Sequence, residues 1–322
     1  MIMHTQQLLT PETTHVPRSG SITLEEVGPV ARPVDSSQPA DQAAQLRRLV
    51  QQTAKHARVL AVTSGKGGVG KTNVAANLAL CLAAAGKSVI LLDADLGLAN
   101  LDILLPVQSH LNLSHVISGR KSLRDVIQTG PAGVKLICGA SGLTAMENLS
   151  DQQRQLLLSQ MASLEHDADF IIVDTAAGIS HNVLAFCKAA DYTLVVTTPD
   201  PAAITDAYAV VKTLAYAEAT TRLSLLVNCA DDRDQAKNLY RKIATIATRF
   251  LDVNLYDAGF ILRDPHLLQA VRKRRPVVLA SPRSPAAAGF LILAQKVART
   301  QNPPQPENHA FFHRVLNWLA KP

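Results

Sequence analysis

The stretch Val59-Leu-Ala-Val-Thr-Ser-Gly65-Lys66-Gly67-Gly68-Val69-Gly70-Lys71-Thr72 decides the fold of this chain. Residues 59–63 suit a short buried strand, and an apolar-periodic run over residues 73–85 suits a helix. Between them, residues 65–72 fit G-x-x-x-x-G-K-[ST], a loop whose backbone N–H groups can surround a polyphosphate. The stretch predicts strand, phosphate loop and helix, with Lys71 on the β- and γ-phosphates and Thr72 on Mg²⁺.

Carboxylates end two further strands of the expected sheet. Asp93 and Asp95 follow the apolar residues 88–92, and Asp174 ends the apolar residues 170–173. Because open α/β sheets bind ligands beyond the carboxyl ends of their strands, these side chains are expected beside the phosphate loop. There they would serve Mg²⁺ and the attacking water of a phosphoryl transfer, although Asp93 and Asp95 could instead cap a turn. The alternation of strands and helices predicts a doubly wound, mainly parallel α/β sheet with helices on both faces.

Composition sets outer limits on function. The 322 residues are 47% hydrophobic and 18% charged, which fits one large α/β domain with tails and excludes a fusion of two enzymes. The net charge of +6 permits an anionic partner but does not choose between nucleic acid and lipid. We expect neither an export signal nor a membrane span, because the longest apolar run, residues 286–294, is too short to cross a bilayer.

The second lysine of the loop carries a family resemblance. Lys66-Gly-Gly-Val-Gly-Lys-Thr72 resembles the deviant phosphate loop of the MinD/ParA ATPases, and the resemblance extends from residue 57 to about residue 300. It implies ATP and Mg²⁺ as cofactors and an ATP-sandwich homodimer in which Lys66 reaches the partner's phosphates. It also implies that Asp93 and Asp174 support Mg²⁺ and that Asp95 orients water. The implied adenine pocket consists of Asn228, Pro276 and Val277, although Asn228 could simply end a strand in a turn.

The N-terminal part contains two segments. Residues 1–40 carry scattered prolines without apolar periodicity, which predicts a disordered extension. Residues 41–56 predict an amphipathic helix, and its Asp41, Gln42, Leu46 and Arg47 are similar to a D-Q-A-x-x-L-R segment of the FlhG/FleN family. These MinD-like ATPases control flagellar number, and in them the segment activates the GTPase of an SRP-type partner, FlhF. Alternatively, the helix is a linker that packs on its own domain.

The C-terminal part repeats this arrangement of linker and helix. Residues 301–310 are rich in proline and predict a linker, and residues 311–322 predict an amphipathic helix. One acceptor for its apolar face is an anionic membrane, because MinD and FlhG proteins have a membrane-targeting helix here; a groove of the same domain is the other. The first reading implies a cytoplasmic protein held peripherally on the inner face of the cell membrane. The residues of the apolar face are Phe311, Phe312, Val315, Leu316, Trp318 and Leu319.

Two features bear on the choice between related functions. The string from Thr198 to Tyr208 also resembles FlhG, which favours a flagellar regulator over a MinD-type division-site ATPase. The basic run from Arg272 to Arg275 suits either the C-terminus of a helix or a phosphate-binding patch, so a ParA-type ATPase that binds DNA is a further alternative. The leading hypothesis is a membrane-associated, FlhG-like ATPase. An iron–sulfur reductase is disfavoured because the four cysteines are dispersed.

Overall fold

The structure is a computed structural model that describes residues 56–95, 101–105, 111–138, 150–217, 219, 221–300 and 311–319. All of these residues belong to one unit, Ala54–Pro322. The predicted extension at residues 1–40 and the predicted linker at residues 301–310 lie outside the described residues. The predicted helix at residues 41–56 lies outside them as well, apart from its last residue, His56.

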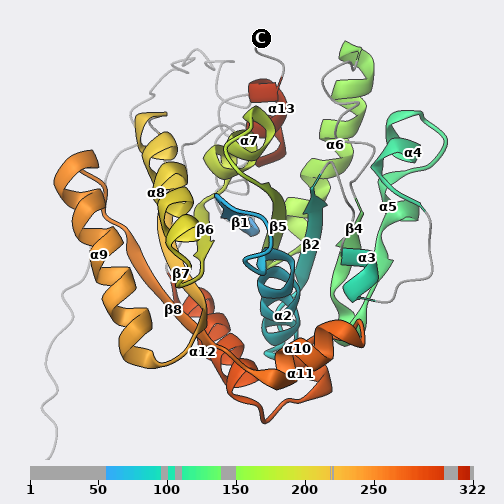
Figure 1. The fold of residues 1–322 in the computed structure, drawn as a ribbon. Helices are drawn as coiled ribbons and strands as arrows, with labels where there is room; N and C mark the ends of the chain where they lie inside the picture. Colours follow the sequence, from blue (N-terminus) through green and yellow to red (C-terminus); the bar gives the residue numbers. More distant parts are fainter. Residues whose placement is uncertain are drawn as a thin grey trace, which may run out of the picture. The chain divides into compact units, whose positions relative to one another are not determined.

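An eight-stranded sheet forms the centre of this unit, in the order β3-β4-β2-β5-β1-β6-β7-β8 (Figure 1). Neighbouring strands are parallel except for β3 and β4. The prediction of a doubly wound, mainly parallel α/β sheet is confirmed. The strands are β1 (Arg58–Ser64), β2 (Val89–Ala94), β3 (Gln128–Thr129), β4 (Lys135–Ile137), β5 (Phe170–Ala177), β6 (Tyr192–Thr197), β7 (Arg222–Ala230) and β8 (Tyr256–Leu262).

Helices cover both faces of the sheet, and each face has its own apolar core. On one face lie α2 (Lys71–Ala84), α3 (Leu101–Leu104), α10 (Pro265–Arg272), α11 (Val277–Ala280) and α12 (Pro285–Arg299). On the other lie α4 (Leu113–Ile117), α5 (Leu123–Val126), α6 (Asp151–Asp167), α7 (His181–Ala189), α8 (Pro201–Tyr216), α9 (Arg233–Leu251) and α13 (Phe311–Leu319). A short 3₁₀ turn, η1 (Pro131–Gly133), precedes β4. Within the described residues, no helix is both long and apolar enough to cross a bilayer.

The order in which successive strands are added to the sheet changes side at β1, and this change determines where the site lies. β1 lies between β5 and β6. From β1 the chain passes through α2 to β2, on the β5 side, whereas from β5 it passes through α7 to β6 on the other side. In open α/β sheets, ligands bind where such connections diverge beyond the carboxyl ends of the strands. The phosphate loop, which follows β1 directly, lies at this position.

Local sequence explains where several helices begin. Asp200, Asp264 and Ser284 each accept a hydrogen bond from a backbone N–H of the first turn of the helix that follows. In each case the next residue is a proline, whose fixed φ and missing N–H suit the first helical position. Ser150 and Gln153 form a reciprocal capping box at the start of α6. Capping residues thus set where α6, α8, α10 and α12 begin.

Candidate nucleotide-binding site and the docked C-terminal helix

The phosphate loop has a backbone that favours glycine. Gly68 and Gly70 have φ angles of 78° and 96°, in the left-handed region that strains other residues. A Cβ atom on Gly70 would lie 2.5 Å from Asn228 Nδ2. A Cβ atom on Gly65 would lie 2.2 Å from the backbone oxygen of Asp206 in α8. Backbone conformation and close packing together account for these glycines.

The N-terminus of α2 is arranged to receive an anion. Among the described residues, no side chain caps this helix end, and its first turn contains no acidic residue. The N–H groups of a helix N-terminus and the positive end of its dipole stabilise negative charge nearby. Because the loop wraps this end of α2, backbone groups are available for phosphate oxygens.

Lys71 is buried and lies near negatively charged side chains. It is the first residue of α2 and is only 9% exposed. Burial lowers the pKa of Lys71, whereas the charges of Asp174 and Asp95 raise it. The structure thus brings the predicted phosphate-binding lysine together with two of the predicted carboxylates. A cation in this position can neutralise phosphate charge.

Asp93 and Asp174 lie opposite each other in adjacent strands, β2 and β5. They are 1% and 2% exposed. Burial raises the pKa of Asp174 to about 7; a hydrogen bond from Thr72 lowers it, and the charge of Asp93 raises it. Asp174 Oδ1 is buried and has no hydrogen-bond partner among the described residues. A hydroxyl and buried carboxylates are oxygen donors of the type that Mg²⁺ prefers, so Thr72, Asp93 and Asp174 fit this ion.

Asp95 lies at the edge of this carboxylate cluster. Its backbone N–H donates to Asp93 Oδ1 at 3.0 Å, which fixes the chain where it leaves β2. Its side chain is partly exposed and interacts electrostatically with Lys71 and Asp174. The predicted water-orienting residue therefore lies beside the predicted phosphate and metal ligands.

Lys66 forms an ion pair that the sequence analysis did not anticipate. Its Nζ lies 3.2 Å from Asp200 Oδ1, and the two side chains are 43% and 50% exposed. The same Asp200 oxygen accepts the backbone N–H of Ala203, which caps α8. The Pro-Asp-Pro sequence around Asp200 signals a helix cap, but only the fold shows that the cap faces Lys66. In this structure Lys66 is thus directed to an acid of its own chain.

The residues of the predicted adenine pocket support the loop and α2. Asn228 is 3% exposed; its Nδ2 donates to Val69 O at 2.7 Å, and its Oδ1 accepts from Cys229 N at 3.0 Å. Pro276 caps α11, and Val277 is completely buried. The next residue, Val278, donates its backbone N–H to Asn77 Oδ1 of α2 at 3.1 Å. Contact of Asn228, Pro276 and Val277 with adenine stays a prediction.

The basic run lies at the end of α10. Arg272 and Lys273 form the last turn and C-cap of this helix, and all four residues of the run are exposed. Arg274 has a φ of 50°, and the Arg275 N–H donates to Ala270 O at 3.0 Å. This arrangement closes a helix C-terminus through a left-handed residue, where positive side chains are favourable.

The C-terminal helix α13 is docked on α6 and α7, on the opposite face of the sheet from α12 (Figure 1). Its Phe311, Phe312, Val315 and Leu316 are between 1% and 3% exposed. The side chain of Leu319 lies outside the described residues. In this state the apolar face is covered by a groove of the same domain, which is the second of the two acceptors expected. Its predicted contact with a membrane is not tested by this arrangement.

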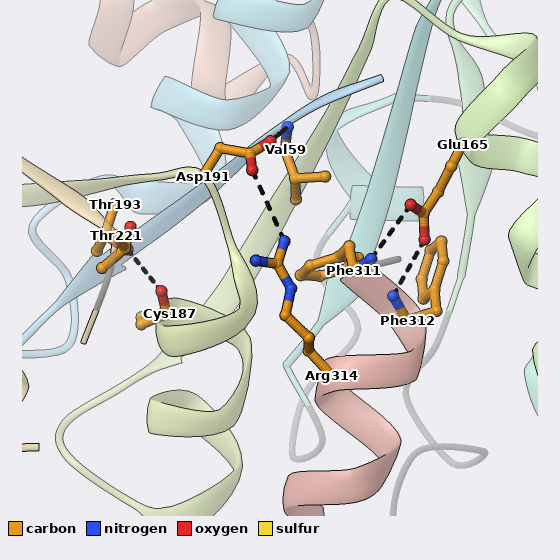
Figure 2. A network of polar contacts seen from close by, with 9 residues as sticks. All are labelled: Val59, Glu165, Cys187, Asp191, Thr193, Thr221, Phe311, Phe312 and Arg314. Atoms are coloured by element: carbon orange, nitrogen blue, oxygen red, sulfur yellow. Dashed lines mark hydrogen bonds and ion pairs between the residues drawn. The ribbon is translucent and has the colours of Figure 1, made fainter. Parts of the chain in front are cut away.

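Polar contacts fix α13 in its groove (Figure 2). The backbone N–H groups of Phe311 and Phe312 donate to the two carboxylate oxygens of Glu165, each at 3.1 Å. Arg314 lies 3.7 Å from Asp191, whose other carboxylate oxygen accepts the Val59 N–H of β1 at 2.9 Å. Glu165 thus occupies the N-terminus of α13, where a negative charge is favourable. The sequence contains no local signal for these contacts.

The sole tryptophan of the chain closes the far end of the groove. The Trp318 ring stacks on His181, the first residue of α7, with 3.7 Å between ring centroids. Lys188 Nζ lies 5.2 Å from the centre of the same ring. Trp318 therefore reports on the docking of α13.

Comparisons with known proteins agree with this site. A family model described as an AAA domain matches residues 57–227. The antiactivator FleN of Pseudomonas aeruginosa is 45% identical over 255 residues, which cover 79% of this chain and 91% of that protein. The flagellum site-determining protein YlxH of Helicobacter pylori is 34% identical over 270 residues, which cover 82% of this chain and 91% of that protein.

The solved structures contain the same fold. The septum site-determining protein MinD of Pyrococcus horikoshii, complexed with Mg-ADP, matches with a TM-score of 0.60 and 26% identity, covering 76% of this chain and 96% of that one. The sheet, the deviant phosphate loop and these relatives agree with one another. The chain belongs to the FlhG/FleN group of the MinD/ParA family of P-loop ATPases.

Proposed function

We propose that this chain is a Mg²⁺-dependent ATPase that dimerises around ATP, binds reversibly to an anionic membrane, and regulates flagellar number and placement with an FlhF-type GTPase. The proposal rests on one observation: α13 is docked on α7. A short loop connects α7 to β5, the strand that contains the proposed metal ligand Asp174. The name of the relative YlxH, a flagellum site-determining protein, supports the flagellar role.

Each residue of the site has a distinct task in hydrolysis. Lys71 and the N-terminus of α2 bind the phosphates, and Thr72, Asp93 and Asp174 hold Mg²⁺. Bound Mg²⁺ would neutralise charge on the phosphate oxygens. Asp95 orients the attacking water, because its partly exposed carboxylate stands beside Lys71 and Asp174. Water is the nucleophile in this scheme.

Dimerisation requires a change at Lys66. To reach the phosphates of a partner subunit, its ammonium group must leave Asp200, 3.2 Å away. Because this pair is half exposed, breaking it costs little compared with the contacts that a phosphate offers.

The loop after β5 links the nucleotide to α13. Gly178, with a φ of 99°, donates its N–H to Ser64 O at 2.8 Å, next to the phosphate loop. Three residues later, His181 stacks on Trp318. A shift of this loop upon γ-phosphate binding would move His181 and weaken the docking of α13. A single short helix with few cations binds a membrane marginally, so two released helices on one dimer would act by avidity.

Trp318 fluorescence tests the proposal in the full chain. The protein is mixed with ATP or ADP in the presence of Mg²⁺, with and without phosphatidylglycerol vesicles. With ATP, vesicles should shift the emission to the blue, whereas ADP should leave the Trp318–His181 stack in place. Lys66→Ala should abolish the ATP-dependent shift and the dimer detected by light scattering. Exposed Lys242→Ala, on α9, is the matched control and should behave as the wild type.

Four outcomes would contradict parts of the proposal. An equal blue shift with ADP would show that the nucleotide does not control the release of α13. Dimers of Lys66→Ala would refute the role of Lys66 across the interface. No vesicle response together with ATP-dependent binding of duplex DNA would favour the ParA-type alternative and the basic run at Arg272 to Arg275. Deleting residues 1–56 should abolish stimulation of an FlhF-type GTPase but preserve basal hydrolysis; stimulation that persists would make residues 41–56 a linker.

A further inference from the structure

A cavity of about 410 Å³ lies between the sheet and α12. Its wall includes the first residues of β1, β5 and β6, namely Arg58, Phe170 and Tyr192. The cavity therefore opens at the amino ends of the parallel strands, whereas the phosphate loop follows a carboxyl end. It is a separate site from the one that binds the nucleotide.

The walls of the cavity are apolar. Leu60, Phe170 and Leu194 come from the sheet, and Leu293 and Val297 come from α12. A volume of this size with aliphatic and aromatic walls is typical of sites for small organic ligands. The apolar lining indicates a ligand with a hydrocarbon chain or an aromatic body.

Positive charge surrounds the same space. Among the described residues, the lining contains Arg58, Arg222, Lys296 and Arg299, but only one acid, Asp257. In the described part of the chain, no carboxylate lies within ion-pair distance of Arg222, Lys296 or Arg299. An anionic group of a ligand would find donors there, and charge-assisted hydrogen bonds of arginine are strong.

Arg58 already donates to a backbone carbonyl of α12, and Lys296 donates to the backbone oxygen of Asp257 at 3.3 Å. Arg299 is exposed, which leaves Arg222 as the cation to test. The Arg58 guanidinium donates to the carbonyl oxygens of Ala298 and Thr300 at 3.2 and 2.6 Å and lies 4.2 Å from the Phe170 ring centre. It thus holds the end of α12 in place. Arg222 begins β7 and is half-buried at the cavity wall.

We infer that this cavity binds an amphiphilic anion, that is, a molecule with one acyl chain or a small aromatic body and one carboxylate, sulfonate or phosphate group. The inference rests on apolar walls joined to excess positive charge, and it is independent of the proposed ATPase cycle. Molecules with an acyl chain and molecules with an aromatic body both combine an apolar part with one anionic group. A fatty-acid chain and a planar aromatic acid are therefore compared in the test.

The probe is 8-anilinonaphthalene-1-sulfonate, titrated into the full chain with saturating Mg-ADP to occupy the nucleotide site. Its fluorescence should rise to saturation at one probe per chain. Dodecanoate and 1-naphthoate are then added as competitors that distinguish an acyl chain from an aromatic body. Dodecyltrimethylammonium carries a similar chain with the opposite charge and should displace the probe much less.

Three variants locate the binding. Arg222→Met keeps the apolar stem but removes the charge, and should weaken binding of the probe about tenfold. Ser224→Phe fills the cavity from β7 and should abolish binding. Arg241 is exposed on α9, a helix that covers the other face of the sheet. The Arg241→Met variant should therefore bind the probe as the wild type does. Circular dichroism melting of all variants shows whether each is folded.

Two results would overturn the inference. Probe binding that does not saturate, or that is equal in Arg222→Met, Ser224→Phe and wild type, would assign the signal to other surfaces. Absence of binding to the folded wild type would mean that other residues of the chain fill the cavity in solution. Failure of either kind leaves the test of Trp318 and ATP unaffected.

Discussion

Replacement of Asp174 by asparagine should stabilise the nucleotide-free protein, and the gain should depend on pH. Asp174 lies in β5 and is 2% exposed, and burial raises its pKa to about 7 from the ordinary value of 3.8. Asparagine has almost the same shape, can still accept the hydrogen bond of Thr72, and carries no charge to bury. The substitution therefore removes an ionisation cost but keeps the packing.

The sign and size follow from the two pKa values. An acid whose pKa is higher in the folded state binds its proton more tightly there, so the free energy of unfolding falls as pH rises from about 4 to about 7. A difference of about three pKa units corresponds to about 4 kcal/mol, all of it lost at pH 8. At pH 5 the loss is only about 2 kcal/mol. The advantage of Asp174→Asn should thus widen by about 2–3 kcal/mol between these pH values.

Urea unfolding at pH 5 and pH 8, without Mg²⁺ or nucleotide, measures this difference. Both proteins are compared at each pH, because titrating groups that do not interact with Asp174 affect them equally. The variant should be the more stable protein, and more so at pH 8. It should also bind Mg-ATP more weakly, since it lacks a metal ligand. A difference in unfolding free energy that is the same at pH 5 and pH 8 would refute a raised pKa of Asp174.

Other substitutions test the remaining features. Asp252→Gly should stabilise the protein by about 1 kcal/mol in thermal unfolding, because Asp252 has a left-handed φ of 53° and carries a negative charge at the C-terminus of α9. An unchanged or lower stability would contradict this explanation. Asp200→Asn keeps the helix cap but releases Lys66, so the dimerisation constant with ATP, measured by sedimentation, should rise up to about fivefold. Weaker dimerisation would show that Asp200 itself contributes to the dimer. Asp95→Ala should bind ATP and dimerise but lose phosphate release, and undiminished turnover would remove Asp95 from hydrolysis.

The sequence was sufficient to predict the fold and the phosphate loop because both depend on local requirements. Gly68 and Gly70 need a left-handed backbone, and a motif records such a need directly. Asp93 and Asp174 each follow a run of buried apolar residues in a strand, and the parallel sheet pairs the two strands so that these residues lie opposite each other. Their proximity could therefore be inferred before their distance was known.

Contacts between distant segments could not be predicted in this way. The ion pair of Lys66 with Asp200 depends on β1 and β6 being neighbours. The Glu165 carboxylate meets α13 only because α13 packs on α6, and one glutamate on a helix carries no sign of that role. The amphipathic pattern of residues 311–319 identified an apolar face but not its acceptor.

The position of α13 has a consequence for biosynthesis. Phe311, Phe312, Val315 and Leu316 belong to the apolar core on one face of the sheet, together with Phe186 of α7. They follow all other residues of that core in the sequence, so this core is completed only after α13 has been made. Until then α6 and α7 present an open apolar groove to chaperones and to neighbouring chains. A messenger truncated before codon 311 would leave that groove open permanently, and its product would be prone to aggregate.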